Sequence, residues 1–199
     1  MSVNELESQL LAAKTAGSND DSTSSAATAK SLSSPPVHLW KPPVSGDIDI
    51  RIDREGRWFH EGGEIKRSAL VALFASVLWE ESGEYFLVTP VEKWRIQVDV
   101  APLLVVRAER AGSGPEACIT CYTHTGDEFI LDKAHPLTVD ADSEGNPLPF
   151  VRVRYSLDAL VHRNVFYQLV DWAEAAATGS MGVWSGGEFF VLAEGDIGV

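Results

Sequence analysis

The stretch from Gly46 to Pro90 constrains the fold most, because two different hydrophobic periods follow each other in it. Ile48, Ile50 and Ile52 alternate with charged residues, which is typical of a half-buried β-strand. Further on, apolar residues recur at helical spacing and predict an amphipathic helix. They are Leu70, Leu73, Phe74, Val77 and Leu78. We therefore expect this stretch to form strand, turn, strand, helix and strand.

Two turn signals separate the elements of this stretch. Gly56 ends the sequence Asp-Arg-Glu-Gly and can supply the positive φ angle of a tight turn between two strands. Pro90 follows the short apolar run 85–88 and has no backbone N–H to donate to a sheet. The helix is thus expected between a strand hairpin and a short apolar strand.

The charge balance excludes two classes of partner. The chain has 199 residues and a formal net charge of −13, from 16 basic and 29 acidic side chains. Binding to nucleic acid draws its affinity from clustered Lys and Arg, and an anionic lipid surface would repel this chain. The sequence therefore predicts neither a nucleic-acid partner nor a membrane partner.

The N-terminal part predicts a tail and a cytoplasmic location. Residues 17–34 are mostly Ser, Thr, Ala and Asp, so they cannot bury enough apolar surface to offset the entropy of ordering. Residues 1–36 are therefore expected to be a disordered tail. The first residues lack the basic start and apolar core of a signal peptide, and the longest apolar stretch, 69–79, is too short to span a bilayer.

Two parts of the chain resemble each other and suggest an internal repeat. The turn at 53–56 matches that at 142–145, the helical segment 65–73 matches 161–169, and the strand 83–88 matches 187–192. A second helix is expected over 157–177. The sequence therefore predicts an α+β fold of two similar repeats, 37–107 and 108–199, each a small antiparallel sheet packed on one helix. The alternative is a chance likeness between two units of common design.

Several segments also resemble a known family, and the run Tyr85-Phe-Leu-Val-Thr-Pro-Val-Glu-Lys93 is the most specific of them. The others are Trp40-Lys-Pro, 46–52, 56–58, 65–67, 70–71, 73–74 and Ile96-Gln-Val-Asp99. From about Pro36 to its end, the chain is similar to the uncharacterised bacterial family called domain of unknown function 1285. The resemblance implies a duplicated α+β fold and a role in signal transduction. The chain departs from the family at Val100 and Leu103, where an acidic residue and Phe are expected. If those positions line a site, the site is altered here.

Both expected helices begin with a basic pair, Lys66-Arg67 and His162-Arg163. The helix macrodipole disfavours each cation there by about 0.3 to 1 kcal/mol, so an anion should compensate. One candidate is a phosphate or carboxylate ligand held by the arginines. The other is an internal carboxylate, from Asp53, Glu92 or Asp99.

The segment from Thr89 to Lys93 is a second candidate site, because it places a hydroxyl, a carboxylate and an ammonium in a loop after a strand. Glu92 could act as a general base and Lys93 as an anion contact. Alternatively, these charges are simply solvated. His60 has no Ser or Cys nucleophile at a motif spacing, so no catalytic triad is predicted. The predicted ligand-binding residues are Arg67, Thr89, Glu92, Lys93, Asp99 and Arg163.

The spacing of Cys118, Cys121 and His124 suits half of a zinc site or a redox pair. The segment also reads as a strand, in which residues three apart point to opposite faces, and no further cysteine exists for a closed site. We therefore predict no metal. The chain has neither a phosphate loop nor a dinucleotide fingerprint, so no cofactor is predicted either.

These features lead to three functional hypotheses. The first is a non-enzymatic cytoplasmic module that binds a small anionic ligand or a protein partner, with a cleft between the two repeats as the expected location. The second is a small hydrolase-type enzyme that uses Glu92, Lys93 and His60. The third is a structural subunit that forms a homo-oligomer through exposed sheet edges.

Overall fold

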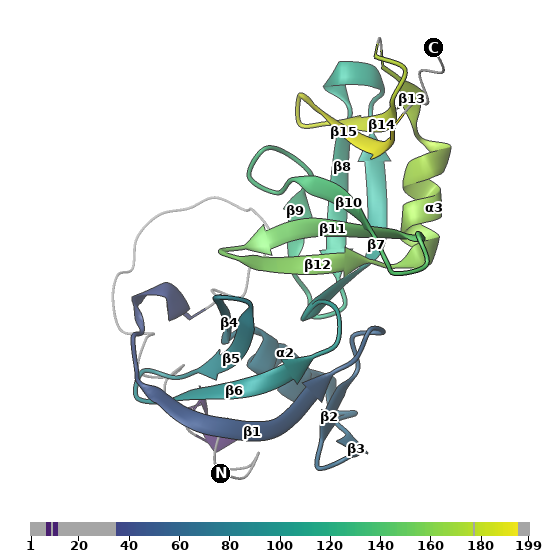
Figure 1. Ribbon diagram of the computed structural model, residues 1–199. Coiled ribbons are helices and arrows are strands. Elements are labelled where there is room, and N and C mark those ends of the chain that lie inside the picture. Colours follow the sequence, from purple (N-terminus) through teal and green to yellow (C-terminus); the bar gives the residue numbers. More distant parts are fainter. Residues whose placement is uncertain (1–6, 9, 12–34, 177, 195–199) are drawn as a thin grey trace, which may run out of the picture. The chain divides into compact units, whose positions relative to one another are not determined.

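The computed structural model describes residues 7–8, 10–11, 35–176 and 178–194 (Figure 1). The expected disordered tail, 1–36, lies almost wholly outside these residues. The chain divides into two compact units, Met1–Asp99 and Val100–Val199. This division precedes the boundary that the sequence suggested between residues 107 and 108. Among the described residues, no helix has the length and apolar character needed to cross a bilayer.

The first unit is built on a six-stranded sheet with the order β3-β2-β1-β6-β5-β4. The strands are β1 (Val44–Ile52), β2 (Trp58–His60), β3 (Gly63–Glu64), β4 (Leu78–Glu81), β5 (Glu84–Val88) and β6 (Lys93–Val98). At the centre, β1 and β6 run parallel, while the other neighbours are antiparallel. A short 3-10 helix, η1 (Val37–Leu39), precedes the sheet, and helix α2 (Ser68–Ala75) connects β3 to β4.

The alternating isoleucines form β1 as predicted, and all three are buried. Gly56 has a φ of 75°, which confirms the tight turn between β1 and β2. Helix α2 is shorter than the apolar stripe predicted, because Leu78 pairs with Leu87 in the β4–β5 ladder. Leu78 is buried in that strand as it would have been in a helix, so hydrophobic spacing alone did not distinguish the two.

The second unit contains another six-stranded sheet, with the order β10-β11-β12-β7-β8-β9. Its strands are β7 (Leu103–Ala111), β8 (Cys118–Thr123), β9 (Glu128–Ile130), β10 (Leu137–Ala141), β11 (Pro147–Arg154) and β12 (Leu157–Val161). The parallel pair is β7 and β12. A 3-10 helix, η2 (Gly114–Glu116), lies between β7 and β8, and helix α3 (Arg163–Asp171) follows β12. The three-stranded sheet comprises β13 (Glu174–Ala175), β14 (Met181–Ser185) and β15 (Glu188–Ala193).

The helix expected over 157–177 is wrong at both ends, because the chain forms β12 before the helix and β13 after it. In that strand Leu157, Ala159 and Val161 are buried on one face, and Leu160 is buried on the other. A strand that is buried on both faces reads as a continuous apolar run, which periodicity cannot separate from a helix. The helix begins only after His162, whose side chain accepts a hydrogen bond from the backbone N–H of Asn164.

The predicted α+β class, with a small sheet packed on one helix in each repeat, is wrong. The described part of the protein is mostly β, with 48% of the described residues in strands, and one of its six-stranded sheets curls into a half-barrel. Helix α2 has eight residues and α3 has nine, so each is only about 12 to 14 Å long. A row of six strands spans about 24 Å, so one such helix cannot cover a sheet. The sheets are also mixed, since each has a parallel pair at its centre.

Candidate functional site

A charged cluster lies where the parallel strands of the first unit end. Ile52 is paired with Val98, so Asp53 and Asp99 follow the C-terminal ends of β1 and β6 on the same side of the sheet. The backbone N–H of Asp99 donates to the carbonyl oxygen of Ile52 at 3.0 Å. Ligands commonly bind at the carboxyl ends of parallel strands in α/β sheets, so these two strand ends are a candidate site.

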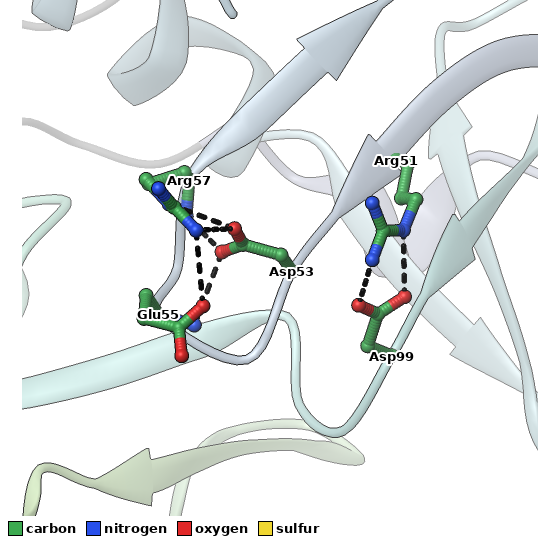
Figure 2. Close-up of polar contacts among 5 residues, drawn as sticks. All are labelled: Arg51, Asp53, Glu55, Arg57 and Asp99. Carbon is green, nitrogen blue, oxygen red and sulfur yellow. Dashed lines mark hydrogen bonds and ion pairs between the residues drawn. The ribbon is translucent and has the colours of Figure 1, made fainter. Parts of the chain in front are cut away.

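Figure 2 shows that Asp53 and Asp99 already have internal partners. Arg51 forms a bidentate ion pair with Asp99, in which the Nε to Oδ1 distance is 2.8 Å. Asp53 is only 5% exposed and accepts from the backbone N–H groups of Glu55 and Arg57, at 3.0 and 2.9 Å. Its other oxygen accepts from Arg57 Nε at 2.7 Å. Asp53 therefore holds the β1–β2 turn in shape.

Electrostatics in this cluster favour permanently charged groups. The hydrogen bonds from Arg51 lower the pKa of Asp99 below its ordinary value. The same contacts raise the pKa of Arg51, and the contacts of Arg57 with Asp53 raise that of Arg57. A general base at neutral pH needs a carboxylate with a raised pKa. This cluster has the character of a set of ion pairs that join strand ends.

The predicted loop residues Thr89, Glu92 and Lys93 do lie together, in the turn between β5 and β6. The hydroxyl of Thr89 is buried and accepts from the backbone N–H of Glu92 at 3.0 Å, which closes the turn. Glu92 accepts from the indole N–H of Trp94 at 3.1 Å. Lys93 pairs with Glu81 and lies 4.7 Å from the centre of the Phe86 ring. All three side chains thus have structural partners.

The other predicted site residues lie elsewhere. Lys93 and Asp99 stand at opposite ends of β6, about 20 Å apart along the strand. Arg67 precedes α2 and forms an ion pair with Glu7, so an internal carboxylate occupies the place considered for a ligand. Arg163, in the second unit, donates from Nε to the hydroxyl of Tyr167 at 2.7 Å. The ligand-binding role of these residues stays a prediction.

Among the described residues, His60, Cys118 and Cys121 do not come together in a catalytic or metal-binding site. His60 is half-buried at the end of β2. Cys118 and Cys121 are free thiols on β8, where the alternating burial places them on opposite faces, as the strand interpretation predicted. Burial raises the pKa of Cys121 to about 12, which leaves it an inert thiol. In the described part of the chain, no three His, Cys, Asp or Glu side chains are placed to hold a metal ion.

The three-stranded sheet presents an apolar face that the other sites lack. In the β14–β15 ladder, Gly182 is opposite Val191 and Trp184 is opposite Phe189, so these four residues share one face. The other face carries Val183, Ser185, Phe190 and Leu192, all of which are buried. The sheet therefore packs against the rest of the second unit mainly through this buried face. We call the set Gly182, Trp184, Phe189 and Val191 the outer face.

The outer face is a platform of aromatic rings. The rings of Trp184 and Phe189 meet edge to face with their centres 5.1 Å apart. A Cβ on Gly182 would lie 2.8 Å from the Phe189 ring, so glycine leaves room for that ring to lie across the sheet. Val191 is 36% exposed, and Met181, next to Gly182, is 40% exposed. Both rings are half-buried, so each also contacts solvent.

Two contacts fix the three-stranded sheet to the rest of the second unit. The backbone N–H of Ile119, in β8, donates to the hydroxyl of the buried Ser185 at 2.8 Å. The N–H of Gly186 donates to the carbonyl of Ala117 at 3.0 Å. The platform is thus held on a rigid support, which suits a binding surface.

Comparison with family models decides the identity of the fold. Residues 35–101 match the N-terminal domain, and residues 102–192 the C-terminal domain, of the domain of unknown function DUF1285. The chain belongs to the DUF1285 family. This confirms the resemblance stated from the sequence. The border between the two family domains lies close to the division of this DUF1285 chain into two units.

Two solved structures are similar to this DUF1285 protein. A DUF1285 family protein from Silicibacter pomeroyi DSS-3 has 42% sequence identity and a TM-score of 0.77, over 93% of this chain and 94% of that chain. Another, from Shewanella baltica OS155, has 29% identity and a TM-score of 0.50, over 62% of this chain and 91% of that chain. No curated protein matches the chain.

The two departures from the family pattern contribute to packing. Leu103 is buried at the start of β7. Val100 packs, with Leu148 and Phe150, against a small buried cluster. The members of that cluster are Ala101, Leu104 and Leu160. An apolar residue at position 100 therefore serves the core of the second unit of this DUF1285 protein.

Sequence reasoning missed the outer face. Phe189 to Leu192 was predicted as a strand, which β15 confirms, but four consecutive apolar residues do not reveal which two face solvent. The available signal was the alternation in β14, where Gly182 and Trp184 flank Val183.

Proposed function

We propose that this DUF1285 protein is a non-enzymatic module that binds a partner protein through the outer face. The observation that supports the proposal is the aromatic platform on a sheet whose opposite side is buried core. Exposed aromatic and apolar side chains on a rigid support are the usual anchors of protein interfaces. The family resemblance adds the proposal that this binding serves signal transduction in the cytoplasm.

The alternatives from the sequence have less support. The hydrolase hypothesis requires Glu92, Lys93 and His60 to act together, yet Glu92 accepts from Trp94 and Lys93 pairs with Glu81. The small anionic ligand requires Arg67, which pairs with Glu7. A partner protein needs none of these groups. The third hypothesis, a homo-oligomer, is distinguished from a partner protein by the experiment below.

Photo-crosslinking from within the outer face tests the proposal. A benzoylphenylalanine residue replaces Val191, and in a matched control it replaces Val91, a valine of the first unit that is 68% exposed. We expect an adduct with another protein from position 191 and none from position 91. The cross-linked protein is then purified, and Val191→Lys should weaken its binding while Val91→Lys should not.

Three results would contradict the proposal. The first is cross-linking no stronger from position 191 than from position 91. The second is an adduct of twice the chain's mass, which would identify a second copy as the occupant. The third is a purified partner that binds both lysine variants as well as the wild type, since its contact would then lie outside the outer face.

A further inference from the structure

The charged side chains of the segment that forms the three-stranded sheet all have the same sign. From residue 164 to residue 194 the chain contains four acidic residues and no Lys, Arg or His. They are Asp171, Glu174, Glu188 and Glu194. Elsewhere, in the first unit, the basic side chains Arg51, Arg57 and Lys93 pair with internal carboxylates. The segment that builds the outer face therefore brings excess negative charge and no cation of its own.

One carboxylate belongs to the outer face itself. Glu174, in β13, is the cross-strand partner of Gly182, so its side chain leaves the sheet on the side of Trp184 and Phe189. Glu188 directly precedes Phe189 and is exposed. Among the described residues, neither Glu174 nor Glu188 takes part in an ion pair.

Three cation–π contacts within the second unit place an arginine over an aromatic ring. The guanidinium of Arg110 lies 5.3 Å from the centre of the Trp172 ring, and its Nη1 donates to the carbonyl of Trp172 at 3.4 Å. Arg107 lies over Tyr122 at 3.4 Å, and Arg163 over Tyr167 at 5.3 Å. On the outer face, Trp184 and Phe189 have the same ring chemistry. Among the described residues, no cation lies over either ring.

We infer that the partner segment docking on the outer face presents a lysine or arginine, which stacks on the Trp184–Phe189 platform beside the carboxylate of Glu174. The attraction between a cation and a ring face, together with an unpaired carboxylate, favours such a side chain over a neutral or acidic one. Val191 and Met181 then contact the apolar neighbours of that side chain. This inference rests on the proposed function and names the chemistry of the partner.

Selection from a phage library of random dodecapeptides tests the inference and does not require an isolated partner. The bait is the full chain, and parallel selections use the Val191→Lys, Glu174→Lys and Val91→Lys variants. We expect wild type and Val91→Lys to enrich peptides with Lys or Arg at one recurrent position. The other two variants should lose this enrichment, because they place a cation where the peptide's cation would bind.

An enriched peptide is then synthesised, with a copy in which its recurrent basic residue is Gln. Replacing the basic residue, or introducing Glu174→Lys, should weaken binding to the purified protein by about tenfold, in line with one lost cation contact of this kind. The affinity should also fall as salt rises, and the indole N–H signal of Trp184 should shift on titration. Circular dichroism of the three variants controls for folding.

The outcomes separate this inference from the function on which it rests. Enriched peptides without a recurrent basic residue would overturn the inference, while photo-crosslinking from position 191 could still support a protein-binding role. Equal enrichment on wild type and Val191→Lys would place the peptide elsewhere and overturn it as well. No enrichment at all on the wild type would also overturn it.

Discussion

The two six-stranded sheets have the same strand order but different additions. In the first unit the strand order is β3-β2-β1-β6-β5-β4. In the second unit, when the sheet is listed starting from β9, the order is β9-β8-β7-β12-β11-β10, which is the same arrangement. In both, two three-strand meanders join through a parallel pair made of the first and last strands. Helix α2 links the two meanders, whereas α3 follows the last strand and leads to the three-stranded sheet. The sheet is thus the common frame, and the outer face belongs to an addition.

The common frame does not follow the sequence match that suggested a repeat. The turn at 53–56 joins the first and second strands of its sheet, while the turn at 142–145 joins the fourth and fifth. The strand 83–88 forms β5 of a six-stranded sheet, and 187–192 forms most of β15 in the three-stranded sheet. The matched segments therefore occupy different places in the two units, and turn chemistry explains their likeness.

The largest expected effect comes from cavities in the two parallel pairs. Ile50 in β1 and Leu103 in β7 are buried at the centre of their sheets. We expect Ile50→Ala and Leu103→Ala each to lower the free energy of unfolding by about 2 to 5 kcal/mol, because each leaves a cavity in a packed core. Hydrogen–deuterium exchange should show faster exchange only in the unit that carries the change. Equal loss of protection in both units would show that the frames do not unfold separately.

An intermediate effect is expected from the glycines that distinguish the sheets. A Cβ on Gly182 would lie 2.2 Å from the carbonyl oxygen of Phe190, so the backbone must shift. We expect Gly182→Ala to cost about 1 to 3 kcal/mol, as overpacking usually does. The control is Gly63→Ala in β3, where the added atom would lie at 3.4 Å from a carbonyl oxygen. If thermal unfolding shows equal losses for both, the close packing of Phe189 and Phe190 on Gly182 is not what distinguishes this sheet.

The smallest effect is expected at the strand ends, where Asp99 follows β6 and His162 follows β12. Arg51 lowers the pKa of Asp99 in the folded chain, so the unfolded chain takes up the proton first as pH falls. The stabilisation is therefore complete above the ordinary value of 3.8 and lost as pH falls through the lower folded pKa. Asp99→Asn should remove at most about 1 kcal/mol at neutral pH, since the pair is exposed.

Urea titrations from pH 2 to pH 7 check this effect. The difference between wild type and Asp99→Asn should shrink to zero at the acid end. Arg51→Gln should produce the same loss, and the double variant should lose no more than either single variant. A difference that persists at the lowest pH would show that Asn disturbs packing instead of removing an ion pair.

The sequence predicted individual strands better than their neighbours. Alternation identified β1, and Gly56 identified the turn between β1 and β2, because both signals are local. The pairing of β1 with β6 joins residues such as Ile52 and Val98, which are far apart in sequence. A local period carries no information about such a partner, so the mixed sheets could not be foreseen.

The candidate site was predicted in part for the same reason. The segment from Thr89 to Lys93 forms a turn, as Pro90 indicated, but the buried hydroxyl of Thr89 serves that turn. The ion pair between Arg67 and Glu7 joins residues whose contact depends on tertiary packing. The outer face required the register of β14 against β15, which only the structure supplies.

The pairing of first with last strand has a consequence for how the protein is made. While the first unit is being translated, β1 is complete long before β6 exists, and it waits with one edge unpaired. Helix α2 and the β4–β5 hairpin can form meanwhile, since their contacts are local. The sheet of the first unit can therefore be completed only after Val98 has emerged from the ribosome. A translational pause before the codon for Val98 would leave the edge of β1 free to pair with other nascent chains.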